Sequence, residues 1–236
     1  MAIPSYIVRH STKAKHLRLK VTPQDGLCII VPGGFDEERI PAILNRKKEW
    51  IEDALSKAKE RRRFLEPKTA DHLPERLVLK AIGEQWSISY HDSRQKAGLR
   101  LYSKLPHLML SGEAFSRTNV LPRLREWLRK RVSHELSPLA HGLAKQKGFN
   151  IGKIFVKNQR TRWASFSARG NLALNVKLLF LSPELVRYAV IHELCHSVHM
   201  NHSKDFWRLV EHHEPSYRRL DNELRAAWKM IPPWLF

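Results

Sequence analysis

Short apolar runs alternate with polar turns through the first part of the chain. Residues 6–8, 17–21 and 27–31 have the length and the apolar, β-branched character of strands, and they predict three of them. After a Pro-Gly-Gly sequence, the acidic start at Asp36 opens a segment with apolar residues at mostly helical spacing. This pattern predicts a helix that continues to about Arg63.

The strand pattern then returns and gives way to a second helical pattern. Residues 77–79, 86–90, 99–102 and 108–110 predict another group of strands. An apolar stripe over residues 119–147 predicts a long helix, and a glycine directly after it is suited to end that helix. We interpret the Leu and Trp residues of this stripe as core.

The last third of the chain combines short extended segments with a clearly marked helix. Residues 151–156 and 172–175 predict strands, and Ser182-Pro-Glu184 is a strong helix start, with serine as N-cap and proline in the first turn. No regular βαβ alternation occurs, so the predicted fold class is α+β. We expect two regions packed as one unit: residues 1–113, strand-rich with one long helix, and residues 114–236, which are mainly helical.

Composition and cysteine content indicate the cellular location, and the composition excludes a membrane-spanning protein. The chain is 42% hydrophobic and 28% charged, and no apolar run approaches the roughly 18 residues that a membrane span needs. The first residues lack the pattern of a secretory signal. Two cysteines, Cys28 and Cys195, lie far apart in the sequence and do not indicate a disulfide framework. These features favour a cytoplasmic location.

The net charge adds a possible partner. A formal charge of +19 is consistent with binding to nucleic acid or another polyanion. The alternative interpretation is a set of solvated basic helix faces. Neither an RNA-binding aromatic motif nor zinc-finger spacing accompanies the charge, so the second interpretation is favoured.

The helix that begins near Pro183 carries the sequence His192-Glu-Leu-Cys-His196. Histidines at i and i+4 share one helix face, so both imidazoles can reach one tetrahedral ion. Glu193 is then placed to accept a proton from a metal-bound water, as in HExxH hydrolases. Cys195 points elsewhere on the helix, and we expect it in the core rather than on the metal.

A third ligand follows the helix. His202 lies ten residues after His192, and Asn201 before it tolerates the left-handed conformation that turns a chain back at a helix end. Three histidines would hold one Zn²⁺ per chain and leave a position open for water, whereas a structural zinc site uses four protein ligands. His199 is the competing candidate, but it continues along the helix axis.

These residues resemble the signature of the YgjP-like (DUF45) zinc metallopeptidases, which are related to the SprT-like and WLM peptidases. The resemblance rests on the HExxH sequence, on Asn201-His202-Ser203 with Phe206-Trp207, and on the upstream segments 161–167 and 170–175. It implies a C-terminal zincin-like core of the minigluzincin type with a single zinc. Where the family pattern reads Gly-Ser-Cys-Ser, this chain has Ala164-Ser-Phe166-Ser.

The predicted function is therefore peptide-bond hydrolysis by zinc-activated water, with Glu193 as general base. Candidate substrate-binding residues are Leu172, Leu174 and Asn175, in an extended segment that we expect to be an edge strand for peptide pairing. Arg162 is a further candidate, for a substrate carboxylate or phosphate, and the alternative interpretation is a structural ion pair. The alternatives are a basic, nucleic-acid-associated protein with a structural zinc, and a protease recruited to DNA-bound proteins.

Overall fold

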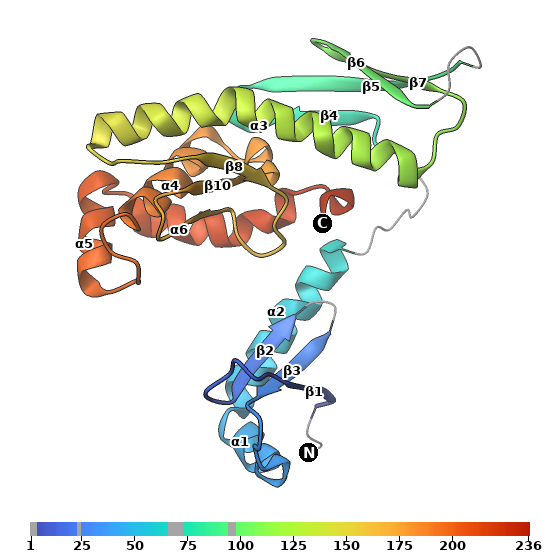
Figure 1. Ribbon diagram of the computed structural model, residues 1–236. Helices are drawn as coiled ribbons and strands as arrows, with labels where there is room; N and C mark the ends of the chain where they lie inside the picture. Colours follow the sequence, from blue (N-terminus) through green and yellow to red (C-terminus); the bar gives the residue numbers. More distant parts are fainter. Residues whose placement is uncertain (1–3, 23–24, 66–72, 94–97) are drawn as a thin grey trace. The chain divides into compact units, whose positions relative to one another are not determined.

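The computed structural model describes residues 4–22, 25–65, 73–93 and 98–236 of the chain. They form a mixed α+β fold (Figure 1), which confirms the predicted fold class. The chain divides into two compact units, Met1–Lys68 and Thr69–Phe236. This division differs from the expected boundary at residue 113, because the second group of strands buries its apolar side chains in the same core as the long helix that follows it.

The first unit is a small three-stranded sheet with helices on one face. Its strands are β1 (Tyr6–His10), β2 (Arg18–Thr22) and β3 (Gly26–Val31). Their order is β1-β3-β2, with β1 parallel and β2 antiparallel to β3. Leu27, Ile29 and Val31 alternate toward the helices, as a half-buried strand requires. They pack against Ile40, Leu44 and Ile51.

The predicted helix from Asp36 to Arg63 is broken into shorter pieces. They are η1 (Glu37–Arg39), α1 (Ile40–Arg46) and α2 (Lys48–Leu65). Lys47 leaves helical geometry, with φ −108° and ψ 16°. The break turns the chain while Ile40, Leu44 and Ile51 all remain in one core, so the apolar spacing alone did not reveal it.

The second unit contains two sheets and the remaining helices. The first sheet comprises β4 (Arg76–Leu79), β5 (Glu84–Asp92), β6 (Arg100–Lys104) and β7 (His107–Gly112), in the order β4-β5-β7-β6. The second comprises β8 (Ile154–Lys157), β9 (Ala164–Phe166) and β10 (Leu172–Asn175), in the order β8-β10-β9. The helices are η2 (Lys80–Ile82), α3 (Arg117–Lys147), η3 (Val176–Phe180), α4 (Pro183–Cys195), α5 (Lys204–His213), α6 (Tyr217–Ala226), η4 (Ala227–Met230) and η5 (Pro233–Leu235).

Helix α3 joins the two sheets of this unit through a common core. Trp127 of α3 meets Trp86 of β5 edge to face, with ring centroids 4.9 Å apart. The same helix packs against α4 and β8 (Figure 1). One continuous apolar cluster results, and it includes the buried residues of α4.

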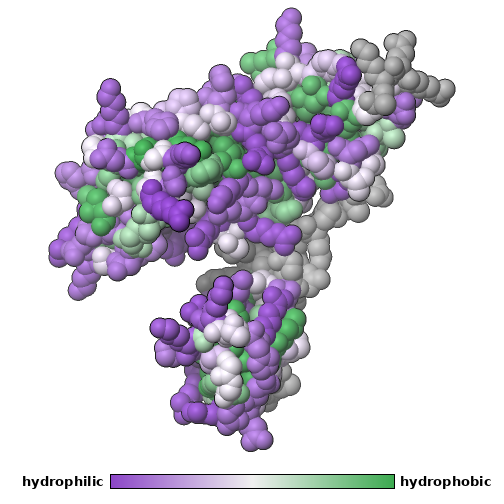
Figure 2. Space-filling view, viewed as in Figure 1, coloured by the Kyte–Doolittle hydropathy of each residue, from purple (hydrophilic) through white to green (hydrophobic). Residues whose placement is uncertain are grey.

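The surface carries no sign of a membrane span. No helix among the described residues is long and apolar enough to cross a bilayer. The face seen in Figure 2 is mostly hydrophilic, with apolar residues scattered between polar ones.

Candidate metal centre and active site

Helix α4 begins as the sequence predicts. The Ser182 hydroxyl accepts a hydrogen bond from the Leu185 backbone N–H at 3.3 Å, and Pro183 occupies the first turn. The helix buries Leu185, Ile191 and Cys195. Cys195 therefore faces the core, as expected, and is a free thiol.

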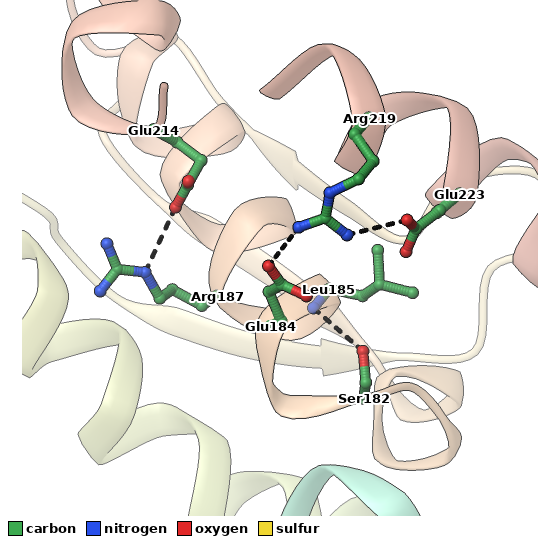
Figure 3. A network of polar contacts seen from close by, with 7 residues as sticks. All are labelled: Ser182, Glu184, Leu185, Arg187, Glu214, Arg219 and Glu223. Atoms are coloured by element: carbon green, nitrogen blue, oxygen red, sulfur yellow. Dashed lines mark hydrogen bonds and ion pairs between the residues drawn. The ribbon is translucent and has the colours of Figure 1, made fainter. Parts of the chain in front are cut away.

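Ion pairs attach α4 to the helices that follow it (Figure 3). Arg219 of α6 binds Glu184 of α4 and also Glu223, one turn further along α6, at 2.8 Å. Arg187 of α4 reaches Glu214, directly after α5, at 3.4 Å. Exposed pairs contribute little individually, but together they fix the direction of α4 relative to α5 and α6.

Three imidazoles converge at the end of α4. One ring nitrogen from each of His192, His196 and His202 lies within 4.8 Å of the other two. His192 is half-buried, His196 is buried and His202 is exposed, so the cluster extends from the core to the solvent. It is the one group of this kind among the described residues, and no fourth Cys, Asp or Glu joins it.

The tautomer of His196 is fixed by the main chain. Its Nδ1 lies 2.9 Å from the His199 carbonyl oxygen, which can only accept, so Nδ1 carries the proton and Nε2 offers its lone pair. His199 therefore supports a ligand through its backbone. Its side chain does not belong to the triad, in agreement with the sequence prediction.

The turn that delivers His202 differs from the expected one. No non-glycine residue in the described part of the chain has a positive φ, so the prediction of a left-handed Asn201 was wrong. Instead, the Asn201 side chain accepts a hydrogen bond from the Ser203 N–H at 3.2 Å. Ser203 in turn caps α5 through the Phe206 N–H. An Asx turn followed by an N-cap thus reverses the chain.

Aromatic residues of α5 support the imidazoles. The Phe206 ring centroid lies 4.5, 4.7 and 5.1 Å from those of His196, His202 and His192 respectively. Phe206 is fully buried and contacts all three rings at once. Its place under the triad could not be read from the sequence, because it depends on how α5 folds back.

The spacing of one pair of donors, from His192 and His202, matches that of a tetrahedral zinc site. Nε2 of His192 and Nε2 of His202 are 3.1 Å apart. Two nitrogens at zinc distances of roughly 2.0–2.1 Å would be about 3.3 Å apart on a tetrahedron. Burial and the neighbouring imidazoles of His196 and His202 lower the pKa of His192 to about 4, so this ring is neutral and ready to bind near pH 7.

Glu193 lies beside the triad in an apolar setting. Burial raises the pKa of its carboxyl to about 7, against the opposing effects of a hydrogen bond from the Phe166 backbone N–H and of the Arg162 charge. A carboxylate with a pKa near the working pH can both take and return a proton. Arg162, predicted as a substrate contact, is exposed and lies within electrostatic reach of Glu193.

The strand that the sequence predicted at the edge of a sheet lies in the middle of its sheet. Residues Leu172–Asn175 form β10, which pairs with β8 on one side and β9 on the other, and all four are buried. Leu172 and Leu174 are therefore core residues, and no free edge remains for a peptide. The edge next to Glu193 belongs to β9, Ala164–Phe166, whose sequence is short and unremarkable as a strand.

Asn175 has a structural task. Its side-chain amide donates to the carbonyls of Gln159 and Arg162 at 2.8 and 2.6 Å, and its oxygen accepts from the Lys177 N–H. These bonds fix the loop that carries Arg162 rather than facing a substrate. Leu172, Leu174 and Asn175, predicted to contact the substrate, are therefore structural residues, and Arg162 alone of the four predicted contacts is exposed.

A carboxylate that sequence reasoning missed lies behind the triad. Asp221 of α6 accepts a hydrogen bond from Tyr188 at 3.1 Å and an ion pair from Arg225 at 2.7 Å. Its charge acts on His192 and on His202, opposing the depression of both pKa values. Negative charge behind metal-binding imidazoles strengthens them as ligands. Only the packing of α6 on α4 brings Asp221 close, so the sequence carried no signal for it.

Comparison with known proteins identifies the family. Residues 15–227 match the model of the YgjP-like metallopeptidase domain. Among solved structures, the metallopeptidase zymogen abylysin of Pyrococcus abyssi aligns at 25% identity and a TM-score of 0.35, over 38% of this chain and 91% of its own. The zymogen jannalysin of Methanocaldococcus jannaschii aligns at 20% and 0.35, over 39% and 95%. No curated protein matches the sequence. The family match spans most of the chain, and the chain belongs to the YgjP-like metallopeptidases.

Proposed function

We propose that this metallopeptidase is a zinc-dependent enzyme that hydrolyses peptide bonds, with Glu193 as general base and a zincin-like core of the minigluzincin type. The observation that carries the proposal is the convergence of three imidazoles, without a fourth protein ligand among the described residues, beside the half-buried carboxyl of Glu193 on α4. Structural zinc sites are closed by four protein ligands, so this set suits catalysis better.

His192, His196 and His202 would hold the ion. When bound, zinc supplies a Lewis acid that activates water near neutral pH and polarises the scissile carbonyl. Glu193 takes the proton of the attacking water and returns it to the leaving amine. The Phe166 N–H, which donates to this carboxylate, orients it toward the triad.

The substrate main chain is proposed to pair with the free edge of β9. Ser167 donates to the Asn171 carbonyl and Asn175 donates to the Trp163 carbonyl, so these residues belong to hydrogen-bonded pairs with β10. Alternation along an antiparallel ladder then turns the main-chain groups of Ala164 and Phe166 away from β10. The Phe166 N–H among them already donates to Glu193, so the Ala164 N–H and the carbonyls of Ala164 and Phe166 are the groups that a peptide could use in β-augmentation.

Arg162 is also proposed to contact the substrate. It precedes β9, at the end of the strand that is away from the β9–β10 turn. Its side chain is exposed, and its backbone carbonyl is held by the Asn175 amide at 2.6 Å. A guanidinium on a fixed backbone suits a substrate carboxylate or carbonyl oxygen.

The test compares zinc-loaded wild type with Glu193→Gln on a peptide library from a denatured proteome. The amide cannot accept a proton, so we expect Glu193→Gln to retain zinc and fold while losing at least about 100-fold in turnover. Glu211→Gln, an exposed glutamate of α5, is the matched control and should leave turnover unchanged. Equal turnover in wild type and Glu193→Gln would refute the proposed role of Glu193.

A further inference from the structure

A pocket opens directly beside the metal centre. Its volume is about 380 Å³, at the lower end of the roughly 300–1,000 Å³ typical of ligand sites. Three segments form its walls: the end of α3 with the residues that follow it, the turn between β9 and β10, and the residues after α4. None of these segments is close to another in the sequence.

Two residues belong to both the pocket and the proposed active site. His196, a member of the triad, lines the pocket, and so does Phe166. The Phe166 N–H donates to the Glu193 carboxylate, so the pocket begins where the end of β9 meets the proposed general base. A peptide lying along β9 would continue into this space.

The lining contains no Asp, Glu, Lys or Arg side chain. Its apolar members include Phe149, Phe166, Val198 and Met200, and its polar members are small, such as Ser167 and Ser197. Val198 and Met200 are 58% and 57% exposed. Apolar side chains exposed at the rim of a pocket favour an apolar ligand that covers them, and methionine adapts readily to different shapes.

The wall formed by the β9–β10 turn is held in place. Gly170 adopts φ +76° and donates to the Ser167 carbonyl at 2.9 Å, which closes the turn. Its carbonyl accepts from the Gly152 N–H at 2.8 Å, and the Asn171 side chain accepts from the Lys153 N–H at 2.9 Å. These hydrogen bonds fix the shape of this wall of the pocket.

The direction of β9 decides which part of a substrate reaches the pocket. Ser167 and Ala168, which follow Phe166, line it, whereas Arg162 lies before the other end of the strand. A peptide that pairs antiparallel with β9 has its N-terminal half on the Phe166 side. The residue in the pocket would then precede the scissile bond.

We infer that this pocket is a specificity site that receives an uncharged, apolar side chain of the substrate on the N-terminal side of the scissile bond. The inference rests on the proposed peptidase function. It adds the substrate class: peptides with a residue such as leucine, methionine or phenylalanine before the cleaved bond.

The first experiment measures cleavage by the zinc-loaded full chain on a proteome-derived peptide library. Wild type should favour apolar residues before the cleaved bond by about tenfold or more over Asp and Glu. Ala168→Trp, which fills the pocket from an exposed position, should remove this preference, and Met200→Ser, which removes apolar lining without added bulk, should weaken it. Ala114→Trp, an exposed alanine outside the pocket lining, should leave the preference unchanged.

A binding experiment separates this inference from the proposed function. Zinc-loaded Glu193→Gln is titrated with labelled peptides that carry leucine or aspartate at one position, with and without Ala168→Trp. Tighter binding of the leucine peptide, lost with Ala168→Trp, supports the pocket even where wild type cleaves nothing, and the absence of cleavage would then refute the peptidase proposal alone. Equal binding of the leucine and aspartate peptides would overturn the inference. A cleavage preference for apolar residues that survives both pocket substitutions would do the same, as would a preference for the residue after the cleaved bond.

Discussion

At the scale of single residues, the metal centre depends on where a few atoms point. His196 presents Nε2 because a backbone carbonyl holds its other nitrogen, while His192 and His202 face each other at 3.1 Å. Two residues that neighbour the triad in sequence supply no ligand atom. Cys195 packs in the core, and His199 contributes only its main-chain carbonyl, which contacts Nδ1 of His196.

Zinc occupancy tests this assignment. Alanine at His192, His196 or His202 should lower zinc affinity by more than the roughly 10- to 100-fold that loss of an outer hydrogen-bond partner costs. His199→Ala keeps its carbonyl and should retain about one zinc per chain. Metal content after dialysis against a weak chelator distinguishes the four variants. Full zinc in His202→Ala together with loss in His199→Ala would reverse the ligand assignment.

At the scale of elements, Lys177 is an unusual member of η3. It is fully buried, donates to the Asn158 side chain and to the Gln159 carbonyl at 2.9 Å, and lies 5.0 Å from the Phe236 ring centroid. Burial, with the charges of Arg125 and Arg160, lowers its pKa from 10.5 to about 8.

The depressed pKa of Lys177 predicts a pH-dependent stability. Between about pH 8 and 10.5 the unfolded chain binds this proton and the folded chain does not, so the free energy of unfolding rises with pH in that window. Below about pH 8, Lys177 is charged in both the folded and the unfolded chain, and the free energy of unfolding is lowered by the full cost of burying this charge. Relative to Lys177→Met, wild type should gain on the order of 2–3 kcal/mol across the window. Denaturant unfolding at both pH values measures the gain, and a relative loss would contradict the depressed pKa.

The elements also show which features could be predicted. The α4 start at Ser182 and the helical pair of histidines depend on residues that are close in sequence, and both were predicted correctly. The exposed edge of the sheet was not, because Leu172–Asn175 looks extended in any position, and only the long-range pairing with β8 and β9 makes it central. Asp221 and Phe206 reach the site by the same kind of long-range packing.

At the scale of the whole molecule, the net charge of +19 is a feature to which the structure assigns no role. This net value already counts the acidic residues, but several basic side chains are engaged in ion pairs with them. Arg131 of α3 pairs with Glu84 and with Glu135, and Arg129 pairs with Glu126. These contacts fit the interpretation of solvated basic faces better than a surface kept free for phosphates.

The charge nevertheless predicts an interaction with nucleic acid that depends on salt and not on sequence. Binding to labelled duplex DNA should appear at low salt and weaken with a log–log slope of about −0.9 per phosphate neutralised. Titrations at two salt concentrations with two unrelated sequences provide the measurement. Affinity that differs strongly between the sequences would point to specific recognition, and no binding at low salt would limit the charge to a role in solubility.

The two hydrophobic cores share no side chain among the described residues: one gathers around Leu27 and Ile40, the other around α3 and α4. Separate cores can melt separately, so scanning calorimetry should resolve two endotherms rather than one. The proposed zinc ligands all lie in the second unit, so by mass action added zinc should raise the melting temperature of that endotherm alone. A mutation that weakens the first core would then reduce the heat absorbed in one transition while the metal centre keeps its thermal resistance.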